Sequence, residues 1–157
     1  AMPGDNKLKL TGQLGKVMRE SAQAAFSVVK SMTEKLEVEA DKFSGQDFHL
    51  HVPAGAVPKD GPSAGIAMFT SLASLLTSRP VRADVAMTGE ITLKGLVLPI
   101  GGLKEKLIAA KAAGIKTVIL PERNRKDMAE IPAQARSKMK FKYVKTAADV
   151  LKYALEK

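Results

Sequence analysis

Residues 58–68 form the stretch Pro58-Lys-Asp-Gly-Pro-Ser63-Ala-Gly65-Ile-Ala-Met68, in which a loop rich in proline and glycine leads into an apolar segment. Small and apolar residues continue to about residue 78, where Arg79-Pro80 ends the pattern, so a helix is predicted over 63–78. Residues 53–61 contain two prolines and two glycines and are expected to be a loop. The chain therefore carries a serine at a junction between loop and helix.

Helical and strand patterns alternate along the rest of the chain. Apolar residues at spacings of three and four from Leu14 to Leu36 predict a long amphipathic helix capped by Thr11. Gly101-Gly102 opens a helix over 103–113, which Gly114 ends. This interleaving predicts a mixed α/β or α+β fold of helices and short sheets. The other expected elements are strands at 47–52, 85–92, 96–100, 117–120 and 138–143, and helices at 125–130 and 147–156, the last with a capping box of Thr146 and Asp149.

The composition limits the kinds of protein that this chain can be. Its 157 residues, 45% of them hydrophobic, suffice for one domain over 1–157 with a core of its own. The lack of cysteine excludes disulfides, thiolate zinc sites and a cysteine nucleophile. No apolar run is long enough to predict a membrane span, and no signal peptide is recognisable. Ala1-Met2 is typical of a cloning remnant, so residues 1–7 are expected to be a flexible start.

The formal net charge of +9 comes from residues 61–157, because basic and acidic residues balance before them. The densest basic segment, residues 136–145, suggests binding to nucleic acid or to an acidic partner. Within it, Lys138, Lys140 and Lys142 alternate with apolar residues, which is typical of an edge strand with one solvated face. The solvated strand is the favoured interpretation, since aromatic residues make up only 4% of the chain.

Ser63 is a candidate nucleophile, because the first amides of a helix have no partner within the helix and can hold an oxyanion. The simpler alternative is that Ser63 only caps the helix. A serine nucleophile needs a base. His49 and His51 are the only histidines, so a Ser–His–Asp arrangement with Asp47 or Asp60 stays open.

A lysine is the other candidate base. On the helix over 103–113, Lys106 lies on the flank of the apolar side next to Ala110, whereas Lys104 and Lys111 are expected to point to solvent. Burial and the positive end of the helix dipole both favour the neutral amine that a base requires. The alternative is a lysine whose amine reaches out to water.

Two other patterns allow more than one interpretation. Asp47, His49 and His51 share one face of a strand, where they could hold zinc or iron, although a strand with one wet face, its histidines lining or supporting a cleft, is favoured. Thr88 precedes Gly89 and interrupts an apolar stretch. Its hydroxyl could orient a buried lysine, and a bulge caused by the glycine explains the pattern equally well.

Six motifs taken together closely resemble the proteolytic domain of Lon-type ATP-dependent serine peptidases, in the form of the bacterial and organellar A-type branch. They follow the order of that family from about Leu8 to the end of the chain. The motifs are Leu10-Thr-Gly-Gln-Leu-Gly-Lys-Val-Met-Arg-Glu-Ser21, His49-Leu-His-Val-Pro53, the stretch 58–68, Ala86-Met-Thr-Gly-Glu-Ile-Thr-Leu93, Leu98-Pro-Ile-Gly-Gly-Leu-Lys-Glu-Lys-Leu-Ile-Ala-Ala-Lys111 and Lys116-Thr-Val-Ile-Leu-Pro121.

The resemblance implies a catalytic dyad of Ser63 and Lys106. Thr88 matches a threonine beside the dyad lysine, and Asp60 matches the acid of a loop that switches between blocked and open forms in relatives. The other supporting residues implied by the serine motif are Gly61, Pro62 and Ala64.

The implied activity is endoproteolysis of unfolded or damaged proteins, coupled to an ATP-driven unfoldase. The ATPase and N-terminal substrate domains are not among these 157 residues, so we expect no cofactor or metal here, with ATP and Mg²⁺ used by the ATPase domain. The resemblance further implies a hexameric ring and a location in the bacterial cytoplasm, with the mitochondrial matrix as the alternative. The basic segment 136–145 makes DNA a candidate further partner, which peptidase activity would not exclude. The rival functions are a basic binding module at residues 136–145 and a metal hydrolase using Asp47, His49 and His51.

Overall fold

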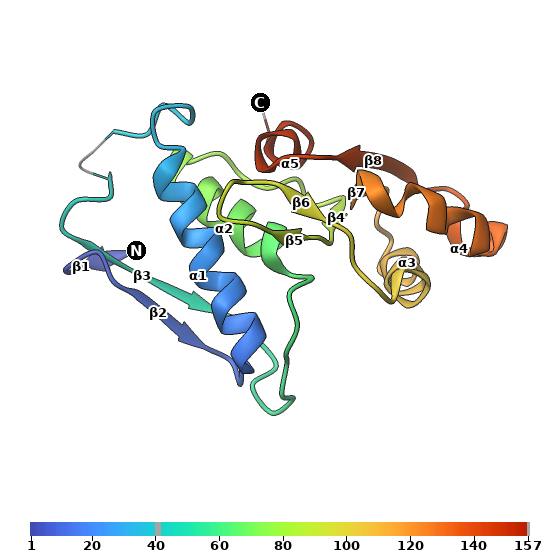
Figure 1. The fold of residues 1–157 in the computed structure, drawn as a ribbon, viewed down its shortest axis with the longest axis horizontal. Helices are drawn as coiled ribbons and strands as arrows, with labels where there is room; N and C mark the ends of the chain where they lie inside the picture. The colour runs from blue at the N-terminus through green and yellow to red at the C-terminus, as the bar shows by residue number, and fades with distance from the viewer. Residues whose placement is uncertain (40–41, 157) are drawn as a thin grey trace.

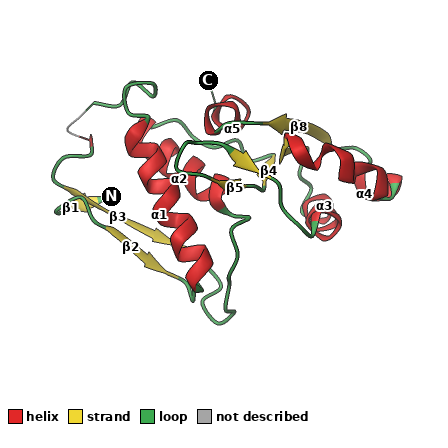
Figure 2. Ribbon diagram, in the orientation of Figure 1, coloured by secondary structure: helices red, strands yellow, loops and turns green. Residues whose placement is uncertain are grey.

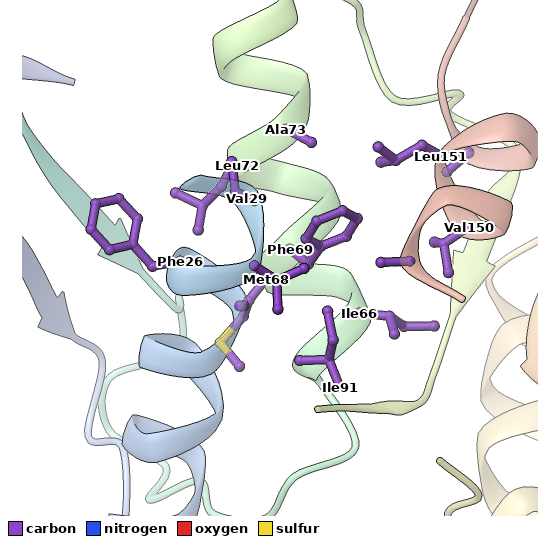
Figure 3. Packing of buried hydrophobic residues seen from close by; sticks show 14 of the residues in the cluster. Phe26, Val29, Ile66, Met68, Phe69, Leu72, Ala73, Ile91, Val150 and Leu151 are labelled. Atoms are coloured by element: carbon purple, nitrogen blue, oxygen red, sulfur yellow. The ribbon is translucent and has the colours of Figure 1, made fainter. Parts of the chain in front are cut away.

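Two helices packed against each other form the centre of the fold. The computed structural model describes residues 1–39 and 42–156, and in it α1 (Lys16–Ser31) packs along α2 (Gly65–Thr77) (Figure 1). The apolar residues of α1 recur at spacings of three and four, so they bury one face of that helix. Helix α2 is apolar on most sides and is buried between α1 and α5 (Ala147–Ala154), with Phe69 lying toward Val150 and Leu151 (Figure 3).

A small sheet covers the other side of α1. Its strands β1 (Met2–Pro3), β3 (Gln46–His51) and β2 (Leu8–Thr11) lie in that order, with β2 and β3 parallel. Phe48 of β3 is buried against Phe26 of α1 at a ring-centroid distance of 5.2 Å. The alternation along β3 therefore turns Phe48 to the core and the neighbouring polar residues to the outer face.

A parallel sheet forms the second layer of the molecule. Strands β4 (Val85–Met87), β7 (Thr117–Pro121) and β8 (Lys140–Val144) lie in this order, and β7 is buried along its whole length. Its residues alternate between two hydrophobic clusters: Ile119 joins the one formed with α2 and α5, while Val118 and Leu120 join the other. That second cluster is contributed by α3 (Leu103–Ala112), η2 (Glu122–Glu130) and neighbouring residues, and α4 (Ala133–Arg136) packs on α3 (Figure 2).

A two-stranded hairpin completes the fold. Strands β5 (Glu90–Ile91) and β6 (Val97–Leu98) are antiparallel and are joined by a turn in which the Gly95 N–H donates to the Thr92 carbonyl oxygen. None of the described helices combines the length and the apolar character needed to span a bilayer. The mixed α/β fold with short sheets, as expected from the interleaved patterns, is confirmed.

The first helix begins later and ends earlier than its periodicity predicted. Thr11 is not its cap: Thr11 ends β2, where it pairs with His51, and Gly15 is the residue before the helix. The helix ends at Ser31 rather than Leu36. Pairing with β3 places Thr11 five residues before Lys16, where its hydroxyl contacts His49 and His51 instead of the first amides of the helix. Residues 1–7, expected to be a flexible start, include β1, which pairs with β3.

The predicted strand 85–92 is divided into two, and its halves belong to different sheets. Strand β4 pairs with β7, whereas β5 pairs with β6. Between them, the Gly89 N–H donates to Ser63 and the Gly89 carbonyl oxygen accepts from Ile66. The chain therefore turns toward the start of α2 and leaves the parallel sheet of β4, β7 and β8. The capping box of Thr146 and Asp149 was predicted correctly. The lysine-rich strand, predicted at 138–143, is present as β8 but begins at Lys140, because Lys138 has φ +65° and cannot join the extended strand.

Replacing Leu72 by alanine should lower the free energy of unfolding by about 2–5 kcal/mol, because Leu72 is 5% exposed and its loss leaves a cavity in the main core. Leu93 is 70% exposed, so Leu93→Ala is the matched control and should change stability by less than about 0.5 kcal/mol. Urea unfolding measures both. Equal losses in the two variants would contradict this core.

Candidate active site

A cavity of about 530 Å³ is lined by the start of α2, by β4 and by α3. Its polar lining side chains are Ser63, Thr88 and Lys106, all three of which were expected near the site. The other lining residues are small or apolar: Ala64, Ala67, Ala86, Met87, Leu107, Ala109, Ala110, Ala113, Ile115 and Val118. The fold thus brings a hydroxyl and an amine from distant parts of the chain to one apolar cavity.

Ser63 is not the helix cap. Helix α2 begins at Gly65, and Ala64 is the residue in the capping position, with no side-chain hydrogen bond at this terminus. Ser63 lies one residue earlier, is half-buried and lines the cavity. The capping alternative for Ser63 is therefore wrong, and its hydroxyl is available for other chemistry.

The backbone of Ser63 is held by the turn between β4 and β5. The Ser63 carbonyl oxygen accepts hydrogen bonds from the Thr88 hydroxyl at 3.1 Å and from the Gly89 N–H at 2.9 Å. In return the Ile66 N–H donates to the Gly89 carbonyl oxygen at 3.1 Å. The Thr88 hydroxyl thus helps to fix the position of the serine, and its oxygen, which lines the same cavity as Lys106, keeps the capacity to accept a hydrogen bond.

Close packing at the start of α2 requires glycine at position 65. A Cβ atom added to Gly65 would lie 2.9 Å from both the Ile91 backbone nitrogen and the Ser21 hydroxyl oxygen. The Ser21 hydroxyl also donates to the Pro62 carbonyl oxygen at 3.4 Å. Sequence analysis missed Ser21; its only signal was a polar residue within the periodic apolar face of the first helix.

Asp60 connects the loop before the serine to α1. Its carboxylate accepts hydrogen bonds from the Met18 N–H at 2.9 Å and from the Gly61 N–H at 2.8 Å, and these lower the pKa of Asp60 below its usual 3.8. Helix α1 has no side-chain cap of its own at Gly15, so Asp60 supplies one from 42 residues away. Gly61 has φ +112°, a backbone conformation that residues with a side chain rarely adopt.

Lys106 lies in the first half of α3, where it is half-buried and lines the cavity. Lys104 is exposed, as predicted. Lys111, predicted to be a solvent lysine, instead donates hydrogen bonds to the Gln134 carbonyl oxygen and, at 2.9 Å, to the Ser137 hydroxyl. The correction follows from α4, whose presence beside α3 was not predicted.

Asn124 is a further residue that sequence analysis missed. It is 1% exposed, and its side-chain amide bonds both backbone groups of Ile100, accepting from the N–H at 3.0 Å and donating to the carbonyl oxygen at 2.9 Å. Ile100 lies just before α3, so Asn124 fixes the start of the helix that carries Lys106. An asparagine within a polar segment gave no signal of this role.

The histidines lie away from the cavity. His49 and His51 are on the exposed face of β3, and the Thr11 hydroxyl is 2.9 and 2.7 Å from their ring nitrogens. They therefore do not line a cleft with Ser63, and the Ser–His–Asp alternative is not assembled.

Asp47 is buried and committed to the N-terminal segment. Its carboxylate accepts from the Lys7 N–H at 2.9 Å, which lowers the Asp47 pKa against the effect of burial, and from the Asp5 N–H at 2.8 Å. Among the described residues, no three His, Cys, Asp or Glu side chains are grouped so that they could hold a metal ion.

A serine hydroxyl, a lysine amine and apolar walls within one α/β cavity are compatible with a serine peptidase domain. Comparison with known families agrees: the chain belongs to the Lon protease (S16) C-terminal proteolytic domain family, whose model matches residues 1–157. The resemblance drawn from the six motifs is therefore confirmed.

Similar proteins include the Lon proteases of Syntrophus aciditrophicus (strain SB), 58% identical over 157 residues, and of Xanthomonas oryzae pv. oryzae (strain KACC10331 / KXO85), 60% identical over 156 residues. A third, the Lon protease of Paraburkholderia phytofirmans, is 56% identical over 154 residues. These matches cover 100%, 99% and 98% of this chain but 20%, 18% and 19% of the relatives. The chain thus spans about a fifth of the length of the curated relatives it matches.

Thr88→Val should loosen the first turn of α2, because it removes one of the two donors to the Ser63 carbonyl oxygen. One such hydrogen bond corresponds to about a fivefold increase in amide exchange of residues 65–68. Thr88→Ser keeps the hydroxyl and should preserve the protection. Hydrogen exchange by NMR compares the two variants, and equal exchange in both would contradict the role of this hydroxyl.

Titration of the Asp60 carboxyl by NMR should give a pKa below 3.8. Because the ionised form is the one that is hydrogen-bonded, its contribution to stability is complete above the unfolded pKa and is lost as the pH falls through the folded pKa. Asp60→Asn should therefore be less stable than the wild type at pH 7, with the difference shrinking in acid. Equal stability of the two proteins at pH 7 would contradict a stabilising contribution from the charge of the Asp60 carboxylate.

Proposed function

We propose that this domain hydrolyses peptide bonds with Ser63 as nucleophile and Lys106 as general base. The observation that carries the proposal is that these two side chains line one cavity, although they come from different helical regions. Neither histidine is among the lining residues, so Lys106 is the basic side chain available to the serine there. The family membership of the chain supports the same assignment.

The reaction proceeds in two steps. Neutral Lys106 accepts the proton of the Ser63 hydroxyl as its oxygen attacks the peptide carbonyl carbon. Protonated Lys106 then gives this proton to the leaving amine, the carbon–nitrogen bond breaks, and an acyl-enzyme remains. In the second step Lys106 takes a proton from water, the resulting hydroxide equivalent attacks the ester, and Ser63 recovers its proton as the acid product leaves.

The Ser63 and Ala64 amides are our candidates for the oxyanion hole. Neither of these N–H groups donates a hydrogen bond to a described residue, and both precede α2, where helix amides lack internal partners. Pro62 has no N–H, and the Gly61 N–H is used by Asp60. Release of Asp60 from Gly61 would add a third donor, which gives Asp60 and Gly61 a supporting role.

The chemistry of the cavity suits unfolded chains. Its walls are almost wholly apolar, so they accept apolar side chains that a folded substrate keeps buried. We propose that the substrates are unfolded or damaged proteins, and that in a longer protein this domain works with an ATP-driven unfoldase that uses ATP and Mg²⁺. A hexameric ring and a cytoplasmic location are part of the same proposal and rest on the family resemblance, and the relatives named above support a bacterial source.

Residues 136–145 do not line the cavity of Ser63. Binding of a partner, whether DNA or protein, by this segment would therefore accompany peptidase activity rather than replace it. The metal-hydrolase alternative has less support, because Asp47 is already hydrogen-bonded to two backbone amides.

Ser63→Ala and Lys106→Ala should each lower the cleavage of a fluorogenic peptide and of an unfolded protein by at least about a thousandfold, since each removes one member of the dyad. Ser71→Ala and Lys104→Ala are matched controls on the exposed faces of the same helices and should retain activity. Thermal melting followed by circular dichroism checks that all four variants fold.

A serine-directed covalent inhibitor provides an independent measurement. Mass spectrometry should find the label on Ser63, and Lys106→Ala should slow the labelling because the hydroxyl loses its base. Unchanged turnover in both dyad variants, or a label on another serine, would refute the assignment.

A further inference from the structure

Five basic side chains converge on a second groove, which shares no lining residue with the cavity of Ser63. This basic groove has a volume of about 420 Å³ and lies where β4, β7 and β8 begin, beside α5. Among its described lining residues Asp84 is the one acid, so the formal charge of the lining is +4. The basic residues are Arg82, Lys116, Lys138, Lys140 and Lys142.

The backbone under the groove is fixed by the parallel sheet. The Lys116 N–H donates to the Asp84 carbonyl oxygen at 3.0 Å, and the Lys140 N–H donates to the Lys116 carbonyl oxygen at 2.8 Å. These bonds place Asp84, Lys116 and Lys140 side by side where three strands begin. The backbone positions of these residues are therefore set by the strand spacing rather than by a loose loop.

The lysines of the groove are not neutralised within the described part of the chain. Asp84 is paired with Arg82, through contacts of 3.2 and 3.0 Å between guanidinium nitrogens and carboxylate oxygens. No ion pair is found there for Lys116, Lys138, Lys140 or Lys142. Like charges gathered in one groove repel, and an anionic ligand relieves that repulsion.

The spacing of the lysines matches an extended peptide. Lys140 and Lys142 project from the same face of β8, and side chains two residues apart on a strand are about 6.6 Å apart. An extended peptide repeats its own side chains at that distance. The groove extends from β8 over the starts of β7 and β4, so a peptide running along Lys140 and Lys142 also lies close to Lys116.

The same lysines select among possible occupants. A second copy of β8 would bring lysine against lysine and be repelled, whereas a strand with acidic side chains is attracted. For nucleic acid the groove offers little stacking surface, because its aromatic residue, Tyr153, already has Lys142 Nζ at 5.0 Å and Lys152 Nζ at 5.8 Å from its ring centroid.

We propose that the basic groove binds an extended acidic segment of another protein, with Asp or Glu at alternate positions facing Lys140 and Lys142. Recognition combines the charge of the groove with the spacing of Lys140 and Lys142 along β8. Binding needs no turnover at Ser63, so this proposal stands or falls separately from the proposed peptidase activity.

The test uses fluorescence anisotropy with a labelled eight-residue peptide that alternates glutamate and threonine. The protein is the full chain carrying Ser63→Ala, so that the peptide is not cleaved. Replacing Lys140 and Lys142 by glutamine should weaken binding at least about fivefold, as expected for the loss of two exposed ion pairs. The double variant Lys94→Gln, Lys126→Gln loses the same charge at exposed positions outside the groove and should bind within about twofold of the parent.

Two further ligands test whether the groove recognises the spacing of the acidic side chains and whether it prefers a peptide to a nucleic acid. A peptide of the same composition with its four glutamates in one block should bind more weakly than the alternating peptide. A single-stranded oligonucleotide of equal charge should also bind more weakly. The proposal is overturned by absence of binding, by equal losses in the two double variants, by equal binding of the two peptides, or by an oligonucleotide that binds more tightly through Lys140 and Lys142. Thermal melting confirms that both double variants are folded.

Discussion

The hydrogen bonds accepted by the Ser63 carbonyl oxygen link the two halves of the structure at the candidate site, beside the core cluster that both halves share. On one side lie α1, α2 and the sheet of β1 to β3; on the other lie the parallel sheet and α3. Thr88 and Gly89 come from the turn that leaves β4, so their bonds to Ser63 fix α2 relative to that sheet. Since Lys106 is positioned from the sheet side, the alignment of serine and lysine depends on this small contact.

Local sequence patterns were sufficient to predict those helices whose ends are set by neighbouring residues in the sequence. The spans of α2, α3 and α5 followed from periodicity, from glycine and proline at their ends and from the capping box at Thr146. The errors occurred where distant pairing overrode local preference. Thr11 looks like a cap but is held in a strand by β3, and the apolar stretch from residue 85 is broken by contacts with α2.

In the candidate site too, residues marked by a local pattern were predicted and residues defined by distant contacts were missed. Ser63 and Lys106 were found because a loop-to-helix junction and a lysine on an apolar flank are visible in a short window of sequence, and the motifs agreed. Ser21 and Asn124 were not found, because their partners are backbone groups of Pro62 and Ile100, which any residue could supply. A side chain that binds a distant backbone leaves no complementary residue to recognise.

Strand β7 is the single layer of polypeptide between two hollows, the cavity of Ser63 and the basic groove. Val118 turns toward the cavity of Ser63, and its neighbour Thr117 turns toward the basic groove. Because adjacent residues of a strand face opposite ways, a slip of one residue in the pairing of β7 would exchange the walls of both hollows at once. The register of this strand with β4 and β8 thus determines the shape of both hollows.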